Sequence, residues 1–120
     1  MLTLVPSPAA FIRIRASGRL GMDNYRRFEP EFAAELERRD VPIPLLLDMR
    51  GFRGWTPAGL LRDLAWDLRN RRTFSRIAVI GDRRWHGWIT AVGAPLFRGA
   101  VKFFRAGEQS QAQDWLAGRS

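Results

Sequence analysis

The chain has 120 residues, no cysteine and one histidine, which excludes disulfide frameworks, zinc–thiolate sites, thiol nucleophiles and multi-histidine metal sites. Its formal net charge at pH 7 is +8, but the basic residues are dispersed along the chain in pairs such as Arg26-Arg27 and Arg71-Arg72, which disfavours a nucleic-acid binding tail. A 46% hydrophobic and 27% charged composition is typical of a globular protein, so we expect a single domain over residues 1–120.

The N-terminal region predicts two strands. Residues 2–5 form a short apolar run that ends at Pro6, as expected of an edge strand, because proline cannot continue a ladder of hydrogen bonds. Within residues 10–16, isoleucines alternate with arginines, which is the period of a half-buried strand. The dipeptide at 17–18 is predicted to be a turn.

A helix is predicted from about Asp23 to Arg39. Its apolar side chains recur at spacings of three and four, which places them on one helix face: Tyr25, Phe28, Phe32 and Leu36. Pro30 lies inside this segment, so the sequence leaves open whether the helix is continuous, kinked or split there.

The central region predicts a buried strand, a loop and a second helix. Residues 43–49 contain a continuous apolar run, as in a central parallel strand, and residues 51–55 are expected to be a glycine-containing loop. Thr56 and Pro57 suit the N-cap and first position of a helix. We expect this helix to bury Leu60, Leu61, Leu64, Ala65 and Leu68, and to leave Trp66 exposed or in an oligomer contact.

The C-terminal third continues the alternation with a strand at 77–80, a helix at about 84–96, a strand at 101–104 and a helix at 108–116. Strands joined by helical crossovers are parallel. The predicted fold class is therefore α/β, with a mixed, mostly parallel sheet of about five strands and helices packed on it.

A resemblance to a known protein family rests mainly on two short motifs. They are Asp-x-x-x-Phe-x-Gly-Trp at residues 48–55 and Gly-Asp-x-x-Trp at residues 81–85. Together with Phe103-Phe104 and Trp115-Leu116 they resemble the SpoIIAA-like family, a branch of the STAS fold of the anti-sigma-factor antagonists. The resemblance covers about residues 12–116 and implies a STAS-like α/β domain.

The relatives imply two different functions. Phosphorylated antagonists carry an Asp-Ser-Ser-Gly pattern that is absent here, and the hydroxyl nearest to that position is Thr56, a candidate phosphoacceptor whose simpler role is the helix cap. The SpoIIAA-like branch is also similar to CRAL-TRIO lipid-carrier domains, which implies an apolar ligand or contact with a membrane surface.

Tryptophan is the sharpest compositional feature, with five residues in the chain. Trp55 and Trp85 follow the carboxyl ends of predicted parallel strands, where ligand crevices form in open α/β sheets. A packed core and a ligand cleft require the same residue types, so both interpretations stay open. The candidate ligand-binding residues are Phe52, Trp55, Trp85 and Trp88, with Arg53, Arg83 and Arg84 placed to hold an acidic head group.

No arrangement in the sequence indicates catalysis. Asp48 is interpreted as a structural carboxylate that accepts loop amides or pairs with arginine, with a desolvated general base as the alternative. Asp82 is interpreted as a helix cap, and His86 as a surface or capping residue. We therefore predict no enzyme activity, no catalytic residue, no metal site and no cofactor.

The leading hypothesis is a non-enzymatic binding module for a small apolar or lipid-like ligand. The alternative is a STAS-type interaction or regulatory module that acts through a homodimer or a protein partner, with Trp66 as an anchor. Peripheral membrane contact stays open and nucleic acid is disfavoured. The N-terminus lacks a signal-peptide pattern and no apolar run spans a bilayer, so we expect a cytoplasmic protein.

Overall fold

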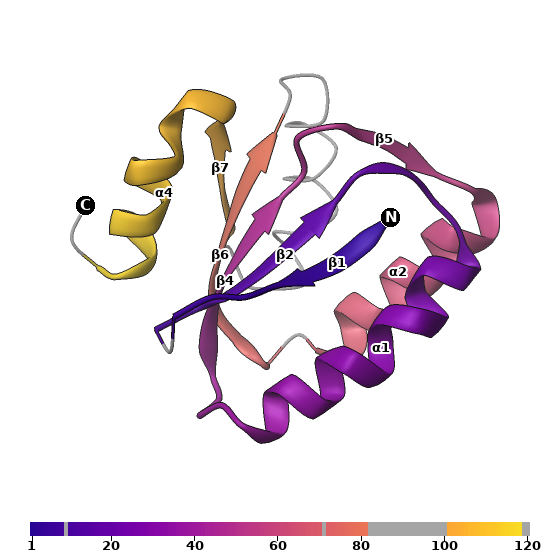
Figure 1. Cartoon of the computed structure of the whole chain (residues 1–120), viewed down its shortest axis with the longest axis horizontal. Helices are drawn as coiled ribbons and strands as arrows, with labels where there is room; N and C mark the ends of the chain where they lie inside the picture. The colour runs from indigo at the N-terminus through magenta and orange to yellow at the C-terminus, as the bar shows by residue number, and fades with distance from the viewer. Residues whose placement is uncertain (9, 71, 82–100, 119–120) are drawn as a thin grey trace.

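The computed structural model describes residues 1–8, 10–70, 72–81 and 101–118. Figure 1 shows a twisted sheet with α1 and α2 on one face and α4 on the other. This is the predicted mixed α/β architecture, which is confirmed.

The main sheet has five strands in the order β1-β2-β4-β6-β7. The edge strand β1 is antiparallel to β2, and the other three pairings are parallel. The predicted edge position of the first strand is therefore confirmed. The strands are β1 (Leu2–Val5), β2 (Ile12–Ala16), β4 (Ile43–Asp48), β6 (Phe74–Gly81) and β7 (Val101–Arg105).

A second, two-stranded parallel ribbon pairs β3 (Gly18–Leu20) with β5 (Phe52–Trp55). The sequence predicted a turn and a loop at these places, and both predictions were wrong. The ribbon extends the β2–β4 pair, and the Gly18 amide donates to the Gly51 carbonyl at 2.8 Å. Gly18 and Gly51 both have positive φ, a conformation that glycine adopts without steric cost. The glycines that suggested a turn and a loop therefore allow the two segments to pair as β3 and β5.

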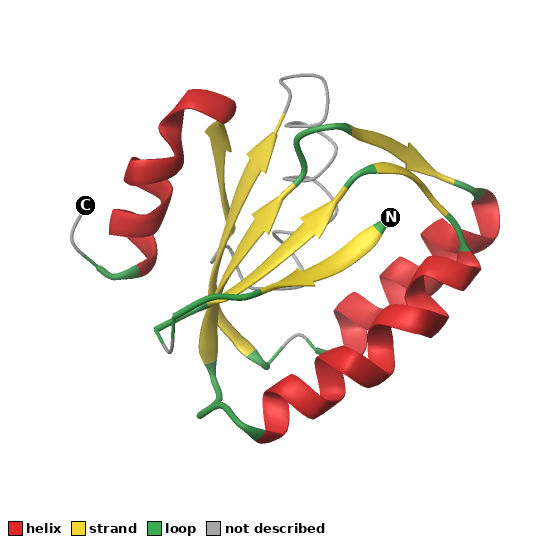
Figure 2. Cartoon of the chain, in the orientation of Figure 1, coloured by secondary structure: helices red, strands yellow, loops and turns green. Residues whose placement is uncertain are grey.

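Two of the helices lie on the same side of the sheet, α1 (Met22–Glu37) and α2 (Pro57–Arg69). Figure 2 shows them side by side, with the shorter α4 (Gln109–Leu116) across the sheet and preceded by the 3-10 turn Ala106–Glu108. α1 continues through Pro30 as one helix, with Pro30 exposed. The predicted helix at 84–96 lies outside the described residues.

Alternation along the strands divides the buried side chains between two clusters. Ile12, Ile14 and Leu45 face α1 and α2, whereas Leu46 and Ile80 face α4. Leu45 and Leu46 are neighbours in the sequence but lie in different clusters, because successive side chains of a strand point to opposite faces. The continuous apolar run that predicted a central strand therefore serves two cores.

The buried face of α2 is only in part the leucine face that the sequence predicted. Leu61 is 70% exposed and Leu68 is 53% exposed. Ala65 is exposed as well, whereas Leu60 and Leu64 are half-buried. The rest of the inner face is formed by Gly59, Asp63, Trp66 and Asp67.

Trp66, predicted to be exposed or to lie in an oligomer contact, packs into the first cluster. Its ring centroid lies 5.2 Å from that of Phe32 and 6.0 Å from that of Phe74. The expectation was wrong because it assigned the inner face of α2 from leucine spacing alone. In the structure, the aromatic side chains of α1 and β6 provide the apolar contact surface for this helix.

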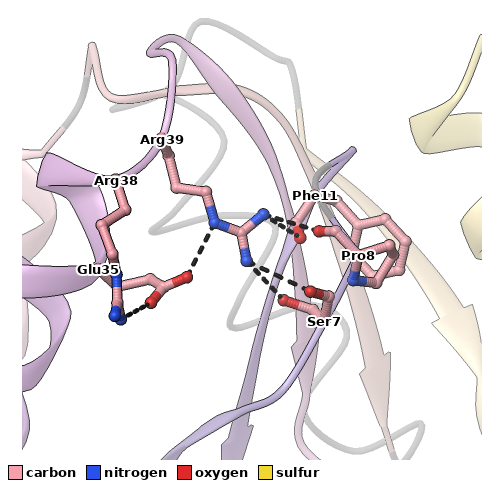
Figure 3. Close-up of polar contacts among 6 residues, drawn as sticks. All are labelled: Ser7, Pro8, Phe11, Glu35, Arg38 and Arg39. Carbon is pink, nitrogen blue, oxygen red and sulfur yellow. Dashed lines mark hydrogen bonds and ion pairs between the residues drawn. The ribbon is translucent and has the colours of Figure 1, made fainter.

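Arg39 fastens the β1–β2 connection to the end of α1, as Figure 3 shows. Its Nη1 donates to the Pro8 carbonyl at 2.7 Å and its Nε donates to Glu35 at 2.9 Å. Further donations reach the Phe11 carbonyl and the Ser7 side chain. The single, mostly buried guanidinium of Arg39 thus donates hydrogen bonds to oxygen atoms of a loop that pairs with no strand.

The N-terminus of α2 lies against β3 at Gly59. A Cβ built on Gly59 would lie 2.2 Å from the Leu20 carbonyl oxygen, a distance that no side chain can occupy. Thr56 caps the same turn, since its hydroxyl oxygen accepts the Gly59 amide at 2.9 Å. This close approach fixes the rotation of α2 and therefore which side chains face the sheet.

We expect Gly59→Ala to lower the free energy of unfolding by about 2 kcal/mol or more, because the added methyl group forces the helix away from β3. Urea unfolding followed by circular dichroism measures this change. Gly107→Ala is the matched control, because a Cβ there meets nothing within 4 Å. Equal stability of the two variants would contradict the role given to Gly59.

Candidate functional site

A cavity of about 90 Å³ lies between the sheet and the helices α1 and α2, and it is partly open to solvent. Its walls are almost entirely apolar and come from every strand of the main sheet. The residues of α1, β5 and α2 in its lining include Tyr25, Trp55, Leu60, Asp63, Trp66 and Asp67.

Three elements meet at the polar end of this cavity through a chain of hydrogen bonds. The Trp55 indole N–H of β5 donates to the Tyr25 hydroxyl of α1 at 2.9 Å. That hydroxyl donates in turn to Oδ1 of Asp63 on α2 at 2.8 Å. Tyr25 is 1% exposed, so this chain is held inside the molecule and both hydrogen-bonding roles of its hydroxyl are filled.

Asp63 and Asp67 lie one turn apart on α2 and hydrogen-bond to each other. Burial raises the pKa of Asp67, and the charge of Asp63 together with the hydrogen bond between the two side chains raises it further, to about 9. Burial also raises the pKa of Asp63, outweighing the hydrogen bonds from Asp67 and Tyr25. The pair therefore holds a proton at neutral pH, with Asp67 as donor and Asp63 as acceptor.

The residues predicted to bind a ligand are only partly gathered here. Trp55 lines the cavity, and Phe52 lies buried behind it with ring centroids 4.7 Å apart. Arg53 is exposed on β5. Trp85, Trp88, Arg83 and Arg84 lie outside the described residues, as do Asp82 and His86.

Thr56, the candidate phosphoacceptor, is the N-cap of α2. Its hydroxyl oxygen accepts the Gly59 amide, as described above, and its backbone amide donates to the Leu20 carbonyl at 2.9 Å. The capping role predicted from the sequence is therefore confirmed. Phosphorylation of Thr56 stays a prediction.

Tyr25, Asp63 and Asp67 were not predicted from the sequence as site residues. Tyr25 was assigned to the apolar face of the predicted helix, and the two aspartates were given no role. A signal was present, because aspartates four residues apart share a helix face with Gly59 and Trp66. The buried face of this helix was instead assigned from the more numerous leucines.

Asp48 forms a second buried polar cluster on the opposite face of the sheet. The backbone amide and the guanidinium of Arg50 both donate to it, at 3.1 Å and 2.6 Å, and Arg15 lies at 3.7 Å. Burial alone would raise the pKa of Asp48, but the hydrogen bonds and charges of the two arginines hold it below its ordinary value. The predicted structural role is confirmed, and this carboxylate is not placed to act as a base.

Comparisons with known proteins agree with this architecture. Residues 11–117 match the model of the family described as SpoIIAA-like. A crystal structure of an uncharacterized protein from the DUF3478 family, with a SpoIIAA-like fold, from Shewanella loihica PV-4, is 26% identical and superposes with a TM-score of 0.80. The similarity covers 97% of this chain and 92% of that one. No curated protein matches.

A helix that crosses a bilayer must be both long and apolar. Each helix within the described ranges falls short of the length and hydropathy that a bilayer crossing demands.

We expect Asp67→Asn to stabilise the protein at alkaline pH by about 1–3 kcal/mol, because it removes a carboxylate that is costly to ionise where it lies. The folded-state pKa is raised, so wild-type stability from this group is full below about pH 4 and is lost as the pH rises toward 9. The advantage of the variant should therefore grow between pH 5 and pH 9.

Urea unfolding at pH 5, 7 and 9 measures this trend, with Asp40→Asn at an exposed position as the control. A stability difference between Asp67→Asn and wild type that stays constant with pH would show that Asp67 ionises as a surface carboxylate does.

Proposed function

We propose that this chain, which belongs to the SpoIIAA-like family, is a non-enzymatic binding module that holds a small apolar or lipid-like molecule in the cavity between its sheet and α1–α2. The family fold is that of regulatory or interaction modules, which are generally non-enzymatic. The observation that carries the proposal is the cavity itself, with its apolar walls and its opening to solvent.

Empty apolar space of this kind is uncommon in a folded protein. Interiors are close-packed, and an unfilled cavity costs stability because the lining atoms lose their contacts. An engineered apolar cavity of about 150 Å³ stays dry and binds benzene. At about 90 Å³ the present cavity suits part of an alkyl chain, and its opening leaves room for the rest of the molecule to reach solvent.

The aromatic residues at the cavity favour such a ligand. Trp55 and Trp66 both line it, and Phe52 supports Trp55 from behind. Tryptophan offers a large apolar surface and one polar group, and the indole N–H of Trp55 is already bonded to Tyr25. The Trp55 ring therefore faces the cavity with its polar requirement met.

We expect Leu60→Trp to weaken binding of 1-octanol at least tenfold, because Leu60 lines the cavity and the larger ring fills it. Leu61→Trp is the matched control, since the neighbouring Leu61 is 70% exposed on the outer side of the same helix. Isothermal titration calorimetry measures both, after near-UV circular dichroism has established that each variant is folded.

Native mass spectrometry of protein purified without detergent complements this test. An added mass in the range of a small lipid, lost on denaturation and absent from Leu60→Trp, supports the proposal. Octanol affinity that is equal in both variants and in wild type would refute binding in this cavity.

One observation favours the alternative, an interaction module that acts through self-association or a protein partner. Leu61 and Leu68 are seven residues apart on α2, so they share a face, and both are exposed. Exposed leucines along one face of a helix are typical of a helix that packs against another protein surface. With Trp66 packed against the aromatic residues of α1, these leucines replace it as the anchors.

On this alternative, a protein that self-associates should become monomeric when Leu61→Glu and Leu68→Glu are combined, because two charges would be buried at the interface. Sedimentation velocity at several concentrations measures the change. The same variant should retain octanol binding, so the two functions separate. A sedimentation profile that is unchanged from wild type would count against self-association through α2.

A further inference from the structure

The cavity has one acidic end. Among its described lining residues the ionisable ones are Tyr25, Asp63 and Asp67, and none of the described lining side chains is basic. Every lining residue from the main sheet is apolar. The two mostly buried carboxyl groups therefore face the cavity, and no basic side chain of the described lining offsets their negative charge.

The nearest described arginines on the same helix are already occupied. Arg62 donates to Glu29 of α1 from Nε at 2.9 Å and from Nη2 at 2.5 Å. Arg69 reaches the other oxygen of the same carboxylate at 3.5 Å. This ion-paired cluster joins α1 and α2 beside the cavity and does not line it. These arginines therefore neutralise Glu29 and do not pair with Asp63 or Asp67.

The hydrogen bonds at this end leave acceptors unfilled. The Tyr25 hydroxyl and the Asp67 carboxyl both donate to Asp63. Two carboxyl groups offer four oxygens, and each has more than one lone pair. The site thus has a surplus of acceptors and a shortage of donors, which is the complement of an ammonium group with its three N–H donors.

The placement of these carboxyls is also contrary to helix patterning. α2 turns Asp63 and Asp67 inward and exposes Leu61 and Leu68. Burying a carboxylate is costly, whereas burying leucine is favourable. Violations of local rules of this kind concentrate at functional sites, where a bound group provides the compensating interaction.

We propose that the cavity takes a molecule with an apolar body and a protonated amine, the ammonium group being held between the carboxyl groups of Asp63 and Asp67. This inference rests on the proposed function, because it names the class of ligand for the same cavity. The apolar body lies against the strands, and the ammonium donates to the carboxyl oxygens that Tyr25 leaves free.

Binding of an ammonium group changes the protonation of the pair. The cation favours two carboxylates, so the shared proton leaves Asp67 and passes to the buffer as the amine enters. The net charge of +8 on the chain opposes non-specific attraction of cations. Selectivity for an amine would therefore have to come from this local pair.

The test uses three probes of equal chain length: octylamine, 1-octanol and octanoate. At pH 7.5 we expect octylamine to bind at least tenfold more tightly than 1-octanol and octanoate. Titration calorimetry in phosphate and in Tris, whose ionisation enthalpies differ, should reveal proton release with octylamine alone.

Asp67→Asn is the test variant, with Asp63→Asn as a second and Asp40→Asn as the surface control. Each replacement at the pair should weaken octylamine at least tenfold more than it weakens 1-octanol, while Asp40→Asn changes the binding of neither probe. Since Asp67→Asn is expected to be more stable than wild type at this pH, loss of octylamine binding would not reflect unfolding.

The outcomes distinguish the two proposals. If 1-octanol binds and octylamine is no tighter, the ammonium site is wrong and the apolar cavity stands. If octanoate binds most tightly, an acidic head group is recognised instead, as the sequence-based assignment of Arg53, Arg83 and Arg84 would require. If none of the probes binds in the cavity, the proposed function fails and the inference fails with it.

Discussion

A hydrogen-bonded chain from Trp55 through Tyr25 to Asp63 joins β5, α1 and α2, and the arrangement of the cavity depends on it. The chain uses the indole donor, both capacities of the phenol hydroxyl and one carboxylate oxygen. Its members come from segments 30 and 38 residues apart, so it forms only when the elements are packed together. The close approach at Gly59 acts with it, since it sets the rotation that brings Asp63 to Tyr25.

Much of the fold was predictable because local and global preferences agree. Alternation at Ile12 and Ile14, the apolar run of β4, and the Thr56-Pro57 helix start each predicted the element that the structure contains. The β3–β5 ribbon was not predictable in this way. Its strands are three and four residues long and contain Gly18 and Gly54, and short glycine-containing segments resemble turns until a partner strand is known.

The candidate site was predictable only in part, for a physical reason. Trp55 was identified because an aromatic residue after a central strand suits a crevice. Asp63 and Asp67 were missed because hydrophobic patterning assigns carboxyls to solvent and leucines to the core. α2 departs from that rule, and it stays packed because Trp66, which lies on Phe32 and Phe74, provides the apolar contact that the exposed Leu61 and Leu68 do not. Sequence periodicity identifies an amphipathic helix but does not say which face a neighbouring element will cover.

The two ends of α1 are held by different chemistry. Beyond its C-terminus, Arg39 binds the loop between β1 and β2 with a guanidinium that stays charged at every pH at which proteins fold. In its first turn, Tyr25 is bonded to a carboxyl pair that gains and loses a proton. A cation that binds the carboxyl pair therefore acts at the first turn of α1 and not at Arg39. The chemistry of the cavity is thereby coupled to the first turn of α1, whereas the other end of the helix is tied to the β1–β2 loop.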